Sequence, residues 1–173
     1  MFLRNYDNII AAWTWGGLGT QFIDGSTKAK STGGIVGDVL LVHDGNSIYP
    51  FKPQGGSYGK TKAVVGNGDT AVSYDDYVLD NQLAITATLA VTLPTYDSTT
   101  GKWVYVNTIS ITNNTVDAVA VSEYGIVLDD VRNIKSYLIY REVLDTPITL
   151  AAGANATIEF IYSYDANPNK PTA

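Results

Sequence analysis

The chain lacks residues on which several kinds of protein chemistry depend. It has no cysteine and only one histidine, His43, in 173 residues. Without cysteine there is no disulfide, no thiolate nucleophile and no cysteine-ligated zinc. A single histidine leaves little for any other transition metal. We therefore expect no metal site and no cofactor, and we expect packing and assembly to stabilise the fold.

Charged residues and long apolar runs are also scarce. Charged residues make up 16% of the chain and hydrophobic residues 45%, which is typical of an ordered globular protein at the low end of the charge range. No run of about 18 apolar residues could span a membrane. Residues 1–17 lack the basic start, apolar middle and cleavage site of a signal peptide. The sequence predicts a soluble protein that is made in a cytoplasm and does not contact membranes.

Glycine and charge divide the chain into two differently built regions. Thirteen of the sixteen glycines precede residue 71. The net charge is +1 over residues 1–70 and −7 over residues 71–173, together the −6 of the whole chain. The acidic region would repel phosphate backbones, so we expect no nucleic-acid binding. We predict a glycine-rich docking arm over 1–70, a folded domain over 71–166 and a flexible tail over 167–173.

The second region has the pattern of an antiparallel β-sandwich. Apolar and polar residues alternate over 83–93 and again over 103–113, and the segment 97–101 between them has turn residues. In the segment around residue 139, the alternation puts Tyr137, Ile139 and Arg141 on one face. About seven short strands fit a sandwich of jelly-roll or immunoglobulin-like type. They are 83–93, 103–113, 118–123, 126–128, 137–142, 148–150 and 157–164.

The first region predicts a short helix and small hairpins. Tyr6, Ile9, Ile10 and Trp13 follow the i, i+3, i+4, i+7 spacing of an amphipathic helix, which at about two turns needs a partner surface. Residues 39–43 are the best strand candidate in this region. The partner of the helix is either the chain's own sandwich or a neighbouring subunit.

No pattern in the sequence supports catalysis. His43 ends an apolar segment, and no G-x-S-x-G motif accompanies it. The glycine groups at 16–19 and 33–37 do not satisfy a nucleotide-binding fingerprint and are interpreted as turn glycines. We therefore predict no catalytic residue and no enzyme activity.

Two groups of carboxylates allow other interpretations. Asp75, Asp76 and Asp80 form one group, and Asp129 and Asp130 form the other. Solvated loops are the simpler interpretation, while oxygen ligands of this kind also suit Ca²⁺. A sandwich-type hydrolase using a carboxylate such as Asp76 is a further alternative.

Aromatic residues give the better indication of function. Twelve tyrosines, three tryptophans and four phenylalanines are present, and aromatic residues are enriched at protein interfaces. Several lie in the glycine-rich region, where burial in a core is least assured and ordinary local packing is the alternative. Our interface candidates, with the helix residues, are Tyr6, Ile9, Ile10, Trp13, Trp15, Tyr49, Phe51 and Tyr58.

Residues 66–164 contain an acidic Asp-Asp-Tyr-x-Leu segment at 75–79, a Ser-Glu-Tyr-Gly-Ile-Val junction at 122–127, and Arg141 followed by Thr-Pro-Ile-Thr-Leu at 146–150 and Gly153. The order of these segments resembles virion structural proteins of tailed bacteriophages. It implies a β-sandwich building block of a head, collar, tail or fibre, and no catalytic residue.

We therefore expect a virion protein that is made in the host cytoplasm and contacts copies of itself and other virion proteins. The alternative is a carbohydrate- or receptor-binding β-sandwich that binds a host glycan or receptor. In that alternative, exposed rings such as Trp15 or Trp103 would stack on sugars as a coplanar platform.

Overall fold

The computed structural model describes residues 1–5, 28–38, 60–130 and 135–165. In these residues the regular structure is β-strand and the strand pairs are antiparallel, which confirms the predicted all-β class. The strands are β1 (Lys28–Lys30), β2 (Val36–Asp38), β3 (Lys60–Gly66), β4 (Thr86–Val91), β5 (Thr95–Asp97), β6 (Lys102–Thr112), β7 (Val119–Asp130), β8 (Lys135–Leu150) and β9 (Asn155–Asp165).

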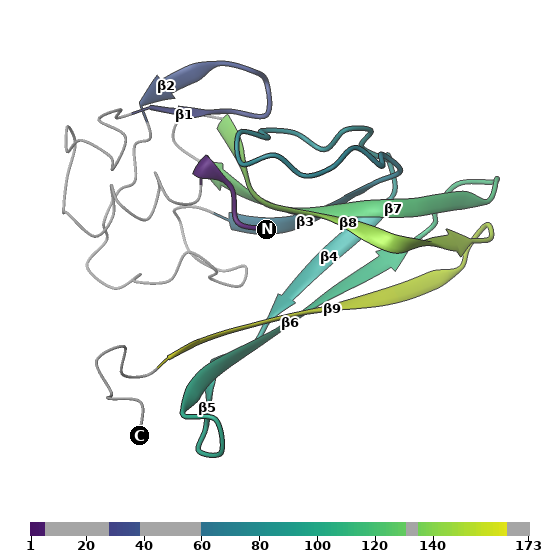
Figure 1. Cartoon of the computed structure of the whole chain (residues 1–173). Helices are drawn as coiled ribbons and strands as arrows, with labels where there is room; N and C mark the ends of the chain where they lie inside the picture. The colour runs from purple at the N-terminus through teal and green to yellow at the C-terminus, as the bar shows by residue number, and fades with distance from the viewer. Residues whose placement is uncertain (6–27, 39–59, 131–134, 166–173) are drawn as a thin grey trace.

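The described strands form a small hairpin and two larger sheets (Figure 1). β1 and β2 make the hairpin. The first sheet has the order β3-β7-β8. In the second sheet, β9 pairs with one edge of β6 along the whole strand, while β4 and β5 pair in succession with the other edge.

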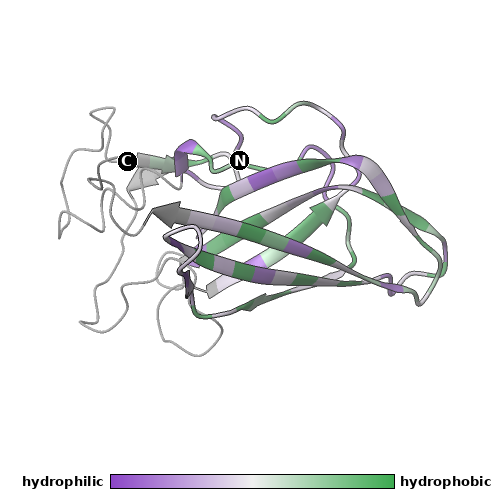
Figure 2. Ribbon diagram, turned by 60° about the horizontal axis from the view of Figure 1, so that its bottom comes forward, coloured by the Kyte–Doolittle hydropathy of each residue, from purple (hydrophilic) through white to green (hydrophobic). Residues whose placement is uncertain are grey.

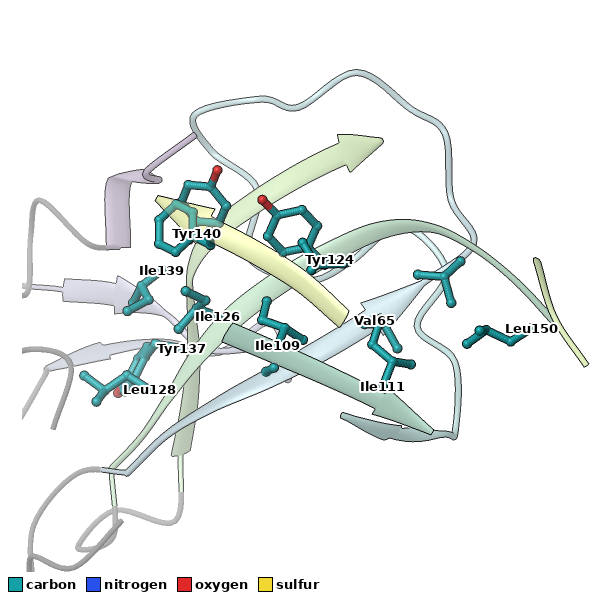
Figure 3. Close-up of a cluster of buried hydrophobic side chains, with 14 of the residues drawn as sticks. Val65, Ile109, Ile111, Tyr124, Ile126, Leu128, Tyr137, Ile139, Tyr140 and Leu150 are labelled. Atoms are coloured by element: carbon teal, nitrogen blue, oxygen red, sulfur yellow. The ribbon is translucent and has the colours of Figure 1, made fainter. Parts of the chain in front are cut away.

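The main hydrophobic core is shared by the two larger sheets (Figure 3). Val65 and Ile126 of the first sheet belong to the same buried cluster as Ile109 and Ile111 of β6. Fully burying a side chain of this size contributes about 1.5–3 kcal/mol. Hydrophilic and hydrophobic bands alternate along many of the strands because one set of side chains enters this core and the other does not (Figure 2).

The first sheet is covered on its other face as well. A second apolar cluster there combines Leu3 and Leu79 with Val64, Val127 and Leu138 of the three strands. Its covering comes from residues 1–5 and from the long connection 67–85, which Figure 1 shows in teal above β3. Sheets covered on both faces lose the alternation of buried and exposed residues, and residues 121–128 of β7 are all buried.

Bulges change which faces the residues of the first sheet occupy. The register between β7 and β8 shifts at Ile126/Val127, where Ile126 pairs with Tyr140 and Val127 with Leu138. Ile139 is the extra residue, so both Ile139 and Tyr140 belong to the main core. The predicted face of Tyr137, Ile139 and Arg141 is therefore wrong for Arg141, which lies on the opposite face.

Four predicted strands form only two. The predicted strands 118–123 and 126–128 are parts of β7, and 137–142 and 148–150 are parts of β8. Gly125 does not end β7. It allows the side chain of Leu138 to approach the backbone of β7, because a Cβ on residue 125 would lie 2.7 Å from Leu138 Cδ1. The second register shift lies between Val121 and Glu123 of β7. The part of β8 opposite this shift includes Pro147, which has no N–H to donate. β5 was not predicted.

The structure has turns at 33–34 and 97–101, where the sequence predicted them. Gly34 has φ +78° at the tip of the β1–β2 hairpin, and Gly101 has φ +71° before β6. The Gly101 N–H donates to Asp97 O at 2.8 Å. The Asp97 side chain accepts from Thr100 Oγ1 at 2.7 Å, a hydrogen bond that lowers the pKa of this carboxyl.

Parts of the N-terminal prediction lie outside the described residues, namely the helix over 6–13 and the strand over 39–43. The described part of this region is not only an arm. β3 pairs with β7 in the first sheet, and Leu3 is fully buried.

Candidate interaction surface

A buried glutamate fixes the connection that covers the first sheet. Glu123 of β7 is 0% exposed. Its Oε1 accepts hydrogen bonds from the N–H groups of Gly68 at 3.1 Å and Asn81 at 2.8 Å. Its Oε2 accepts from the Asp80 N–H at 3.1 Å and from Arg141 Nε at 2.9 Å. Both oxygens are satisfied, as a buried charge requires.

Arg141 of β8 joins this glutamate to a second carboxylate. Its Nη1 donates to Asp76 Oδ2 at 2.6 Å, and its Nη2 donates to Thr70 O at 3.1 Å. Burial alone would lower the pKa of Arg141, but the hydrogen bonds that it donates to Asp76 and Glu123 raise it, so the guanidinium remains charged. We call Asp76, Glu123 and Arg141 the ion network. It attaches the 67–85 connection to β7 and β8, so its role is structural.

The predicted acidic group at 75–80 is divided among different partners. Asp75 pairs with Arg4 Nε at 2.5 Å, Asp76 belongs to the ion network, and Asp80 Oδ2 accepts from Thr70 Oγ1 at 2.6 Å. In the described part of the chain, no three acidic, histidine or cysteine residues are placed to hold a metal ion. The geometry gives no support to the calcium alternative or to hydrolysis through Asp76.

In the second acidic group, Asp129 has structural partners. Asp129 Oδ1 lies 3.0 Å from Lys62 Nζ and accepts from Ser136 Oγ at 2.5 Å. These contacts join β3, β7 and β8 near the end of the first sheet. Asp130 is the last residue of β7.

Asn113 closes the end at which the chain passes between the sheets. Its Nδ2 donates to Asp117 O, Leu150 O and Ala151 O at 2.8–3.1 Å, and its Oδ1 accepts from Thr115. The residue is 0% exposed. This amide belongs to a glycosylation sequon, but in the folded chain its nitrogen is already occupied.

Aromatic rings form a continuous group from the core to the edge of the second sheet. Tyr105 and Tyr162 stack at 4.5 Å with 3° between the ring planes, and Phe2 contacts Tyr162 at 5.7 Å. The phenols of Tyr124 and Tyr140 both donate to Glu142 Oε2. Burial and this carboxylate raise the pKa of both phenols well above the usual value.

Exposed Tyr96 and half-buried Trp103 form a tilted aromatic pair in the second sheet. Tyr96 of β5 is 52% exposed and contacts Trp103 of β6 at 5.5 Å, with an angle of 56° between the rings. A sugar-binding platform needs coplanar rings, and this pair does not provide one. Trp15, the other ring considered for sugar binding, lies outside the described residues.

Large apolar side chains are exposed at loops and strand surfaces. Val116 is 90% exposed, Leu93 83%, Ile35 61% and Ile161 57%. Leu93 follows β4, Val116 lies in the connection 113–118, and Ile161 lies on β9. Single exposed apolar residues are common, but such residues are also the ones that protein partners bury.

The predicted interface candidates are not among the described residues. They are Tyr6, Ile9, Ile10, Trp13, Trp15, Tyr49, Phe51 and Tyr58. Sequence reasoning did not identify Leu93, Val116 or Ile161 as exposed. For Ile161 a signal existed, because it occupies the face of β9 otherwise formed by Thr157, Glu159 and Ser163.

In the residues that the structure describes, no helix is long and apolar enough to cross a membrane. A scan against protein-family models and searches of curated proteins and of solved structures found no match.

Proposed function

We propose that this chain is a non-enzymatic structural protein of a tailed-bacteriophage virion. In this proposal an antiparallel β-sandwich of jelly-roll or immunoglobulin-like type serves as a head-decoration, collar, tail or fibre component. It is made in the host cytoplasm and assembles in the virion with copies of itself and with other virion proteins. The order of segments over residues 66–164 supports this assignment, as does the core shared by two antiparallel sheets.

The observation that carries the proposal is that large apolar side chains are exposed beside strands whose inner residues are buried in the core. Leu93 and Val116 are each more than 80% exposed. They flank strands of the second sheet, whose inner side chains enter the main core. Contact with another protein would remove these side chains from water without rearranging the core, at about 25 cal/mol per Å² of apolar area.

Particle composition tests this function. The chain would be expressed during phage infection, and gradient-purified particles would be analysed by quantitative mass spectrometry. We expect the chain to co-sediment with particles at a fixed copy number. In Leu93→Ser and Val116→Ser variants we expect reduced incorporation with an unchanged circular dichroism spectrum, and in the control variant Ser110→Ala we expect normal incorporation. A protein that stays monomeric at high concentration and never co-sediments would refute the proposal.

A further inference from the structure

The outer edge of β9 differs from the other strand edges in the described chain. β9 pairs with β6 over all of its 11 residues without a register shift, and no described strand pairs with its other side. An unpaired edge presents a row of N–H and C=O groups that can pair with another chain.

The other edges carry features that prevent or occupy such pairing. The outer edge of β8 binds residues 1–3, through Leu3 N–H to Ile139 O at 3.1 Å and Arg141 N–H to Met1 O at 3.1 Å. The outer edge of β4 and β5 is interrupted at 92–94, which includes Pro94. Lysines, prolines and bulges protect strand edges, and β3 carries Lys60 and Lys62. β9 has no lysine, proline, glycine or bulge.

The side chains of β9 alternate between the core and an exposed face that has apolar Ile161 near its centre. Ile158 and Phe160 are buried in the main core, whereas Thr157, Glu159 and Ile161 are exposed on the other face. The geometry points to a second copy of this chain as the partner, with β9 pairing antiparallel to β9 about a two-fold axis at Ile161. The two second sheets then form one continuous sheet.

Charge and side-chain type favour this register. A two-fold axis perpendicular to the sheet keeps each face of the strand on its own side, so the axis must lie between the two copies of one residue. An axis at Glu159 would place two glutamates opposite each other, which is destabilising. An axis at Phe160 would place Glu159 opposite Ile161. An axis at Ile161 pairs the exposed isoleucine with its copy and places Glu159 opposite Ser163.

Cysteine cross-linking tests the pairing and its register. The natural chain has no cysteine, so Ile161→Cys can form a disulfide only between copies. We expect mild oxidation of this variant to give mainly covalent dimer. Thr157→Cys is the matched control, because it is exposed on the same strand and face. In the proposed register the two copies of residue 157 are separated by eight residues, about 27 Å at 3.4 Å per residue, so we expect at least tenfold slower cross-linking.

A charge at the axis provides an independent measurement. Ile161→Lys would place two ammonium groups opposite each other, so we expect its sedimentation to shift to monomer at concentrations where the wild type dimerises. Its circular dichroism spectrum should not change, because the side chain is exposed. A wild-type protein that does not dimerise, or equal cross-linking at residues 157 and 161, would overturn the inference.

This inference rests on the proposed function only for the expectation that copies of the chain meet. If particles contain the chain and residue 161 does not cross-link, the β9 pairing fails and the virion assignment stands. If residue 161 cross-links and no particle contains the chain, the virion assignment fails and the pairing stands.

Discussion

The first and second sheets differ in how their faces and edges are covered. In β7, residues 121–128 are all buried between the main core on one face and the 67–85 connection on the other. In β9, buried Ile158 and Phe160 alternate with exposed residues. The first sheet holds its covering with buried charges, whereas in the described residues the second sheet has one face with exposed side chains and an edge of β9 that pairs with no described strand. The two sheets thus share one core and differ in what lies on their outer faces.

The largest expected effect is on the buried charges of the first sheet. Arg141→Met leaves Glu123 buried without its cationic partner, so we expect it to lower the free energy of unfolding by about 3–5 kcal/mol. Lys62→Met is the control, because it removes a cation whose side chain is 48% exposed in its pair with Asp129. We expect that change to cost at most about 1 kcal/mol. Equal losses in urea denaturation would contradict the contrast between buried and exposed pairs.

Neighbouring residues of β6 separate the two faces of the second sheet. Ile109 is fully buried and Ser110 is exposed. We expect Ile109→Ala to lower the free energy of unfolding by about 2–5 kcal/mol, because it leaves a cavity in the shared core. Ser110→Ala should change it by less than about 0.5 kcal/mol. A substantial loss from Ser110→Ala, measured by thermal and urea denaturation, would show that the outer face is also covered.

Packing around Glu123 can be tested without removing a charge. A Cβ on Gly66 would lie 2.4 Å from Glu123 Oε1 and 2.6 Å from Asn81 O. We expect Gly66→Ala to destabilise the fold by about 1–3 kcal/mol, the range for overpacked sites. At Gly33 the nearest atom would be Ser31 Oγ at 3.8 Å, so Gly33→Ala serves as the control. If the two variants have the same denaturation midpoint, the connection is less tightly held than its contacts indicate.

The smallest expected effect appears only at high pH. The raised pKa values of Tyr124 and Tyr140 mean that the unfolded chain loses these protons first, above about pH 10. Their contribution to stability is complete below that pH and is lost as pH rises toward the folded values. A Tyr124→Phe/Tyr140→Phe variant should therefore lose less stability than the wild type between pH 9 and pH 11.

Urea denaturation at both pH values measures this difference. Tyr96→Phe, which changes an exposed tyrosine, should follow the wild type. Parallel pH dependence in all three proteins would mean that the two buried phenols do not differ from exposed ones.

Strands with one exposed face were the most predictable part of the fold. The alternation over 83–93, 103–113 and 157–164 located β4, β6 and β9, because their inner residues enter the core and their outer residues do not. Residues 121–128 of β7 and 137–141 of β8 are buried on both faces, and the register between the two strands has shifts. Their apolar residues therefore follow no single period, and each was predicted as two short strands.

The ion network was not predicted, although its charges are visible in the sequence. Glu123 and Arg141 each interrupt an apolar segment, which is unusual for strands that enter a core. Their pairing depends on the register between β7 and β8, and that register includes a shift at Val121/Glu123. Alternation alone cannot locate such a shift. The exposure of Leu93 and Val116 likewise depends on where the connections lie in space.

The ladder between β6 and β9 also has a mechanical consequence. Its 11 residue pairs run without interruption from Lys102/Asp165 to Thr112/Asn155. A force that slides β9 along β6 would load all of these pairs together, whereas a force that peels one end would break them one after another. If neighbouring subunits pull on β9 along its axis, the second sheet would resist in its stronger direction.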